Sequence, residues 1–179
     1  TFCVSSLRPD DRFNVISFAS ETRPFRPSLI PATRENIEAA LADIDKIAAA
    51  GGTNINDALL EAIKAKAGAD GDRPYMIVFM TDGEPTVGER EPATIQANVN
   101  KANARTCRLF VFGIGHDLNT KLLDRLAEDN RGAREYIEEK EDIEVKVSSF
   151  FRKVSDPVLS DMELRFPSAD VYDLYPKQL

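Results

Sequence analysis

The chain of 179 residues contains no tryptophan, a single histidine and only two cysteines. Cys3 and Cys107 lie far apart in the sequence and His116 stands alone, so no set of ligands has the spacing of a structural zinc site. These absences argue against a zinc module or a haem protein. We expect both cysteines to be buried thiols, and the sequence leaves open whether they form a disulfide.

Long apolar runs and basic clusters are also missing. No run approaches the roughly 20 residues of a membrane span, and residues 1–4 have neither the basic flank nor the apolar core of a signal peptide. The 23 basic residues are outnumbered by 30 acidic ones, which gives a formal charge of -7, and no local Lys/Arg cluster offsets it. We therefore expect no nucleic-acid partner.

The apolar residues that are present predict an α/β fold, because their period switches between two and 3.6 along the chain. Residues 12–18 alternate like a strand, and residues 22–25 predict an edge hairpin because proline cannot donate to a ladder. Residues 75–80 form a continuous apolar run, which is typical of a central strand buried on both faces. A second buried strand is expected over residues 109–115 and a short edge strand over 133–137.

The helical segments alternate with these strands. Residues 2–7 resemble the end of a helix, and Thr33 can cap a helix whose residues Ile37, Leu41, Ile44 and Ile47 share one face. Further helices are indicated by apolar residues at helical spacing: Ile55, Leu59, Ala62 and Ile63; Ile95, Val99 and Ala102; Leu118, Leu122, Leu126 and Ala127; and Val147, Phe150, Phe151 and Val154.

Ligands of open parallel sheets bind outside the carboxyl ends of the strands, so the loops at residues 51–56, 81–86 and 115–119 are the candidate sites. Thr53 offers a hydroxyl and Asp82 a carboxylate, hard oxygen donors that suit Mg²⁺ or Mn²⁺. Each has an ordinary alternative: Thr53 can cap the next helix, and Asp82 can form a turn before Gly83. His116 lies at the same rim, either simply exposed or in contact with a partner.

Four ordered motifs carry a resemblance to a known family. They are residues 7–18 (LRPDDRFNVISF), 51–55 (GGTNI), 77–85 (IVFMTDGEP) and 111–115 (VFGIG). Together they resemble the von Willebrand factor type A domain, in the branch of the inter-alpha-trypsin inhibitor heavy chains and their bacterial relatives. The resemblance covers about residues 2–157 and implies a Rossmann-like, mostly parallel sheet flanked by helices, with a metal-ion-dependent adhesion site at its carboxyl edge.

The family's site uses an Asp-x-Ser-x-Ser motif after the first strand, a Thr between the second and third helices and an Asp after the fourth strand. Thr53 and Asp82 match the last two, whereas the Asp-x-Ser-x-Ser ligands are absent from the sequence. The resemblance therefore implies an incomplete metal site, with weak or no Mg²⁺ or Mn²⁺ binding by this chain.

The sequence begins near the end of the family's first helix, so the family's first, central strand is also missing. We expect its two neighbours, at residues 13–18 and 75–80, to leave unpaired edges or to pair differently, through a rearranged sheet, strand exchange or a strand from another chain. Self-association or marginal stability would follow. The domain is expected to cover residues 1–157, and residues 158–179 to open a following β segment.

The function that the resemblance implies is a non-enzymatic protein-interaction or adhesion module. Its metal would bind a carboxylate of a protein or extracellular-matrix partner, and the family favours a secreted, periplasmic or cell-surface location. One alternative is a structural module that uses no metal. Another is a metal-dependent phosphohydrolase using Asp82, although the sequence offers neither a second Asp at the required spacing nor a phosphate-holding loop.

Overall fold

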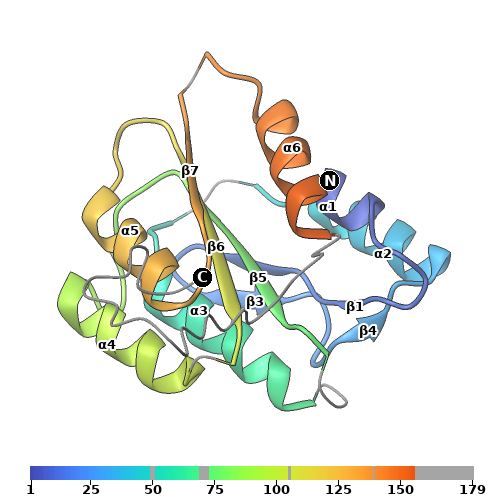
Figure 1. The fold of residues 1–179 in the computed structure, drawn as a ribbon, viewed down its shortest axis with the longest axis horizontal. Helices are drawn as coiled ribbons and strands as arrows, with labels where there is room; N and C mark the ends of the chain where they lie inside the picture. Colours follow the sequence, from blue (N-terminus) through green and yellow to red (C-terminus); the bar gives the residue numbers. More distant parts are fainter. Residues whose placement is uncertain (49–50, 69–72, 105, 139, 156–179) are drawn as a thin grey trace, which may run out of the picture.

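A computed structural model describes residues 1–48, 51–68, 73–104, 106–138 and 140–155. Its elements alternate between helix and strand, which confirms the α/β class (Figure 1). In chain order they are α1 (Phe2–Ser5), β1 (Arg12–Phe13), β2 (Ile16–Phe18), β3 (Thr22–Pro24), β4 (Ile30–Pro31), α2 (Arg34–Ile44), α3 (Ile55–Lys64), the 3₁₀ helix η1 (Ala65–Gly68), β5 (Met76–Thr81), α4 (Pro92–Asn103), β6 (Arg108–Ile114), α5 (Thr120–Asp129), β7 (Arg134–Ile137) and α6 (Ile143–Ser155).

The main sheet is parallel, with strand order β5-β6-β7. Strand β6 lies in the middle and is buried from Leu109 to Gly113, as its apolar run predicts. Strand β7 forms the expected short edge strand. Because the connections β5-α4-β6 and β6-α5-β7 return the chain to the same end of the sheet, the loops after β5 and β6 meet at one carboxyl edge.

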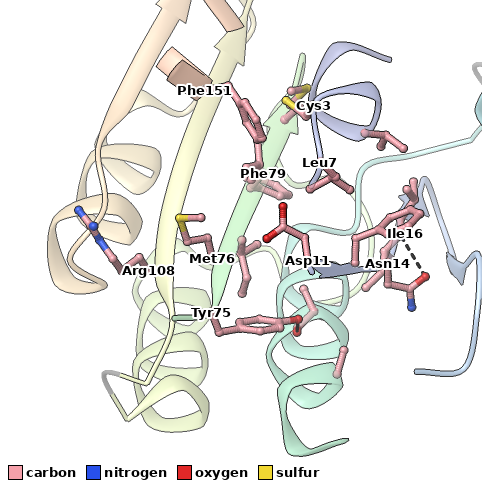
Figure 2. Close-up of a pocket in the computed structure, with 18 of the residues that line it drawn as sticks. Cys3, Leu7, Asp11, Asn14, Ile16, Tyr75, Met76, Phe79, Arg108 and Phe151 are labelled. Carbon is pink, nitrogen blue, oxygen red and sulfur yellow. Dashed lines mark hydrogen bonds between the residues drawn. The ribbon is translucent and has the colours of Figure 1, made fainter. Parts of the chain in front are cut away.

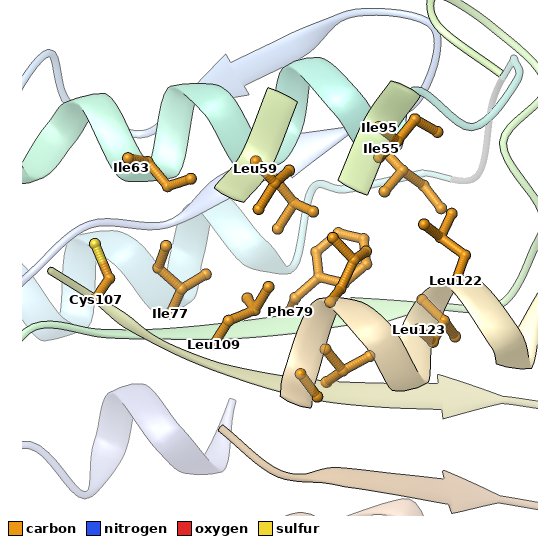
Figure 3. Packing of buried hydrophobic residues seen from close by; sticks show 14 residues of the cluster. Ile55, Leu59, Ile63, Ile77, Phe79, Ile95, Cys107, Leu109, Leu122 and Leu123 are labelled. Atoms are coloured by element: carbon orange, nitrogen blue, oxygen red, sulfur yellow. The ribbon is translucent and has the colours of Figure 1, made fainter. Parts of the chain in front are cut away.

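One face of this sheet packs against α3, α4 and α5. Ile77 and Phe79 of β5 and Leu109 of β6 contact apolar residues of these helices, among them Leu59 and Ile95 (Figure 3). The predicted apolar faces of α3 and α5 are therefore correct. This cluster is the larger core and fixes the carboxyl ends of the strands relative to the start of α3.

The other face is covered by α6. Phe150 places its ring edge-on to Phe110 and Phe112, with both centroid distances at 4.9 Å, and Val147 is buried beside Ile137. In the described part of the chain, no helix is long and apolar enough to span a membrane.

The predicted strand over residues 12–18 is two strands instead. β1 pairs with β4 and β2 pairs with β3, both antiparallel. Asn14 stands at the break, where its side-chain oxygen accepts from the N–H groups of Val15 (2.9 Å) and Arg26 (3.1 Å) and so replaces ladder partners. The hairpin of β2 and β3 is confirmed, with Pro24 opposite Ile16.

The prediction that β5 is a central strand buried on both faces is wrong for the described residues. Ile77, Phe79 and Thr81 are buried, but Met76, Val78 and Met80 are 36–38% exposed. Within the described residues β5 is paired only with β6, so one edge has no neighbouring strand. The exposed edge agrees with the expectation that this strand lacks a neighbour.

Two of the predicted apolar helix faces include a residue that is exposed in the structure. The helix capped by Thr33 ends at Ile44, and Ile47 beyond it is 50% exposed because α2 packs only at the periphery. In α4, Ala102 is exposed and Asn103 is buried in its place, since the Asn103 amide bonds the backbone of Cys107.

Both cysteines are free thiols, so the disulfide alternative is excluded. Cys107 is buried as predicted, whereas Cys3 is half-buried, and burial raises the pKa of each thiol. The predicted domain boundary at residue 157 and the β segment after it lie outside the described residues and stay predictions.

Candidate metal-binding site

The structure brings Thr53 and Asp82 together at the carboxyl edge of the sheet. Asp82 directly follows β5, and Thr53 precedes α3 by two residues. A Cβ atom built on Gly83 would lie 3.3 Å from the Thr53 hydroxyl oxygen, which places this hydroxyl against the turn that carries Asp82. The two residues proposed from the sequence therefore lie on adjacent loops.

Backbone hydrogen bonds fix the loop of Thr53 against the segment after β5. The Thr53 N–H donates to the Thr86 hydroxyl (2.8 Å), and the N–H groups of Thr86 (3.0 Å) and Val87 (3.3 Å) donate to the Thr53 carbonyl. Three bonds to one residue hold its backbone in place. These bonds fix the backbone of Thr53 and do not use its side-chain hydroxyl.

The alternative that Thr53 caps α3 is wrong, because Asn54 is the cap. The Asn54 side-chain oxygen accepts from the Asp57 N–H (3.2 Å), and its amide donates to the Asp57 carboxylate (2.8 Å). Asn54 is buried and the Thr53 hydroxyl has no hydrogen-bond partner among the residues that the structure describes. The hydroxyl oxygen is therefore available to a ligand.

The alternative that Asp82 forms the turn is not supported either. The turn is held by the buried Thr81, whose hydroxyl donates to the Gly83 carbonyl (3.1 Å) and lies 3.4 Å from the Gly83 N–H. The Asp82 carboxylate is exposed and is unpartnered within the described ranges. The carboxylate is therefore not needed to hold this turn.

The third candidate loop follows β6 at the same carboxyl edge and is bonded to β7. Gly115 adopts φ +83° and its N–H donates to the Ile137 carbonyl of β7 (2.9 Å), while Asn119 caps α5. His116 is exposed between them. Over the described part of the chain, no hydrogen bond joins His116 to Thr53 or Asp82.

Ser20 is a residue that sequence reasoning missed. Its hydroxyl accepts from the Gly52 N–H (2.9 Å), and the neighbouring Ala19 carbonyl accepts from the Asn54 N–H (2.9 Å). These bonds attach the hairpin of β2 and β3 to the loop that carries Thr53. No sequence signal identifies Ser20, whereas Asn54 three residues before Asp57 is a recognisable capping pattern.

These residues offer donor atoms of the kind that a hard cation accepts. A carboxylate and a hydroxyl are ligands that Mg²⁺ accepts while it keeps several waters. Among the described residues, no three His, Cys, Asp or Glu side chains gather closely enough to hold a metal ion. The donor set therefore fits a divalent ion in kind but is small in number.

An open parallel sheet with an oxygen-lined carboxyl edge places the chain among Rossmann-like α/β modules. The model of the von Willebrand factor type A domain matches residues 1–136. The chain therefore belongs to the von Willebrand factor type A domain family.

Similar proteins agree with this family. Human inter-alpha-trypsin inhibitor heavy chain H4 is 37% identical over 177 residues, which cover 96% of this chain and 19% of that protein. The chain thus spans about a fifth of the length of this curated relative.

Three solved structures share the fold. A von Willebrand factor type A protein from Catenulispora acidiphila has a TM-score of 0.72 at 22% identity and covers 84% of this chain and 34% of its own. Proximal thread matrix protein 1 of the mussel byssus, with a zinc-occupied adhesion-site motif, has a TM-score of 0.58 at 19% identity, covering 85% and 37%. Manganese-loaded Plasmodium vivax TRAP protein has a TM-score of 0.54 at 21% identity, covering 76% and 57%.

Proposed function

We propose that this chain is a non-enzymatic interaction module that binds a partner carboxylate through Mg²⁺ or Mn²⁺ at Thr53 and Asp82. The observation that carries the proposal is a carboxylate and a hydroxyl on adjacent loops, neither of which has a hydrogen-bond partner among the described residues. Because these oxygen atoms make no hydrogen bond to the described part of the chain, they can bind an external ligand.

The two residues have separate tasks. Asp82 supplies the negative charge that attracts the cation, and Thr53 supplies a neutral oxygen at a fixed position. The metal, when bound, contributes open coordination positions that a carboxylate oxygen of a partner can fill. The backbone bonds from Thr86 and Val87 to Thr53 keep the site from moving when the partner binds.

The related structures support this use of the edge, since one carries zinc in its adhesion-site motif and another is manganese-loaded. The similarity to the inter-alpha-trypsin inhibitor heavy chains supports a partner of protein or extracellular-matrix type and a location outside the cytoplasm. We also propose that residues 1–157 form this module and that residues 158–179 begin the next segment.

A metal titration with matched variants tests the proposal. We expect weak Mn²⁺ binding by calorimetry, because only one carboxylate is present, and its loss in Asp82→Asn and in Thr53→Val. Glu84→Gln removes an exposed acid two residues from Asp82 and serves as the control that leaves binding unchanged. Tight binding that survives Asp82→Asn would refute the assignment.

A metal-independent interaction module is the second candidate. It is favoured by one observation, the absence of a cluster of three acidic or soft ligands among the described residues. It predicts no Mn²⁺ binding by the chain or any of the variants, combined with partner binding that is insensitive to EDTA.

A further inference from the structure

A small hollow lies between the C-terminal ends of α3 and α4. These two helices pack against one another beside the sheet (Figure 1). Helix α3 continues into η1, and α4 ends where Ala104 adopts a left-handed conformation (φ 44°). The space between the two ends, which we call the α3–α4 hollow, measures about 400 Å³ and is lined by Leu60, Ile63, Lys64, Lys66, Ala102 and Thr106.

The floor of the α3–α4 hollow is apolar. Ile63 is part of the larger core (Figure 3), whereas Leu60 is only half-buried. The lining residue from α4 is Ala102, whose side chain is a single methyl group. Because this residue is small, α4 leaves room beside Leu60 for an apolar side chain that comes from outside the chain.

The rim of the hollow is positively charged. The Lys66 ammonium donates to the Thr106 carbonyl (2.7 Å), which does not neutralise its charge and uses one of its three N–H donors. Among the described residues Lys66 has no carboxylate partner. The Lys64 side chain is 77% exposed, and its nitrogen lies 3.7 Å from a Glu61 carboxylate oxygen, a weak surface pair. Both charges can therefore bind an acidic ligand.

Further positive charge lies beside the hollow, at the amino end of β6. Burial raises the pKa of the Cys107 thiol, and the positive charges of Lys66 and Arg131 oppose this shift. The Arg108 side chain, which points away from β5 in Figure 2, donates to the Arg131 carbonyl (3.1 Å). Cations from separate segments thus gather at one end of a chain whose formal charge is -7.

We propose that the α3–α4 hollow binds a short acidic segment of another protein. One bulky apolar side chain of that segment fills the hollow, and acidic side chains on either side of it pair with Lys64 and Lys66. An apolar floor inside a charged rim is the usual arrangement of a protein-binding surface. The volume of about 400 Å³ is close to the lower limit of about 300 Å³ for ligand pockets, so it suits one or two side chains.

A long polyanion fits this surface less well. Nucleic acids and acidic polysaccharides carry regular charge but no apolar side chain that could fill the hollow. They would also extend over the rest of the surface, and the chain has 30 acidic against 23 basic residues, which repel them. A short acidic segment contacts the basic region alone, so the charge distribution favours a polypeptide.

Among the described residues, a second copy of this chain offers no free segment of this kind. Val145 of α6 is 61% exposed and has acidic neighbours. However, the Asp142 carboxylate accepts from the Val145 N–H (3.2 Å), and Glu141 pairs with Lys146 (3.0 Å). Because both acids are already used at the start of α6, we infer a different protein as the partner.

A labelled peptide tests the proposal. The probe has one central leucine with two acidic residues on each side and a terminal fluorophore. One control peptide has serine in place of the leucine, and a second has glutamine in place of the acids. We expect saturable binding of the probe by fluorescence anisotropy, and binding at least about tenfold weaker for either control. No binding of the probe, or equal affinity of the probe and either control, would overturn the proposal.

All of these measurements are made in EDTA, because a metal at Thr53 and Asp82 would also bind acidic side chains. Binding of the probe in EDTA is therefore independent of the proposed metal site. Failure of Mn²⁺ to bind would leave the peptide result unchanged, and failure of the peptide to bind would leave the metal result unchanged.

Two matched pairs of variants locate the peptide. Ala102→Leu fills the hollow, whereas Ala97→Leu makes the same change at another exposed residue of α4. Lys64→Glu reverses a charge at the rim, whereas Lys121→Glu does so at an exposed residue of α5. We expect the first variant of each pair to weaken probe binding at least about tenfold and the second to change it less than about twofold, with circular dichroism spectra retained. An effect of both members of a pair, or of neither, contradicts the proposed hollow.

NMR of the full chain identifies what fills the hollow. We expect the methyl signals of Leu60, Ile63 and Ala102 to shift when the probe binds, and the Thr53 methyl signal to stay unchanged. Residues 170–175 of this chain also combine acidic and apolar side chains. Nuclear Overhauser contacts between these residues and the Ala102 methyl group in the free chain would mean that the chain fills its own hollow, and would contradict the proposal. A dimer that the probe dissociates would contradict it as well.

Discussion

At the scale of single residues, the sequence neighbours Thr53 and Asn54 have different structural roles. Asn54 is buried and caps α3, while Thr53 beside it is anchored through its backbone and, among the described residues, its hydroxyl has no hydrogen-bond partner. The sequence alone placed both functions on Thr53, because threonine is both a good cap and a good metal ligand. Only the spacing from Asn54 to Asp57 could have separated them.

This division predicts that substitutions at the two positions change the free energy of unfolding by unequal amounts. Asn54→Ala should lower the free energy of unfolding by about 1–2 kcal/mol, since it removes a cap and leaves polar groups without partners. Thr53→Val should change it by less than about 0.5 kcal/mol. Urea denaturation of the two variants checks this, and the reverse order would return the capping role to Thr53.

At the scale of elements, Gly132 and Gly115 flank β6 and are needed for different reasons. A Cβ on Gly132 would lie far inside contact distance of the Leu109 backbone carbonyl, whereas Gly115 has no atom within 4 Å of its Cβ position and adopts φ +83°. Gly132 lets the chain leaving α5 pass close to the start of β6. Gly115 supplies only a backbone conformation.

Gly132→Ala should therefore destabilise the protein by about 2–4 kcal/mol, because α5 must move away from β6. Gly115→Ala should cost only about 1 kcal/mol, the strain of a left-handed backbone. Thermal unfolding of both variants gives the comparison. Equal losses would show that backbone conformation, not the close approach, governs both positions.

The elements also show what the sequence could predict. Helices α3 and α5 and strand β6 follow from their apolar periods, since each packs against well-covered neighbours. The run at residues 75–80 has the same apolar character as β6, yet three of its residues are exposed because β5 has no second neighbour among the described residues. The apolar pattern of a segment indicates the environment that suits the strand, but it does not show which neighbouring strands are present.

At the scale of the whole molecule, the parallel sheet gathers loops from distant parts of the chain at one edge. Ser20, Thr53 and Thr86 come from three separate connections and are joined by the hydrogen bonds of Thr53 and Gly52. The place of Asp82 at the end of β5 follows from the apolar run before it, but the bonds that hold the loop of Thr53 could not be predicted, because they join residues more than thirty positions apart.

The same arrangement leaves a groove between β2 and β5. Light scattering of the chain alone tests the sequence-based expectation of self-association, which an unpaired apolar edge favours. A monodisperse monomer with a high melting temperature would refute that expectation.

The central claim is that Thr53 and Asp82 form a divalent-cation site. Paramagnetic broadening of backbone amide signals by substoichiometric Mn²⁺ tests it most directly, because the effect decreases steeply with distance from the ion. The account predicts that the signals of Thr53, Asp82 and Gly83 broaden first and that Asp82→Asn abolishes the effect. Broadening centred on the acidic residues 135–144, unchanged in Asp82→Asn, would contradict it.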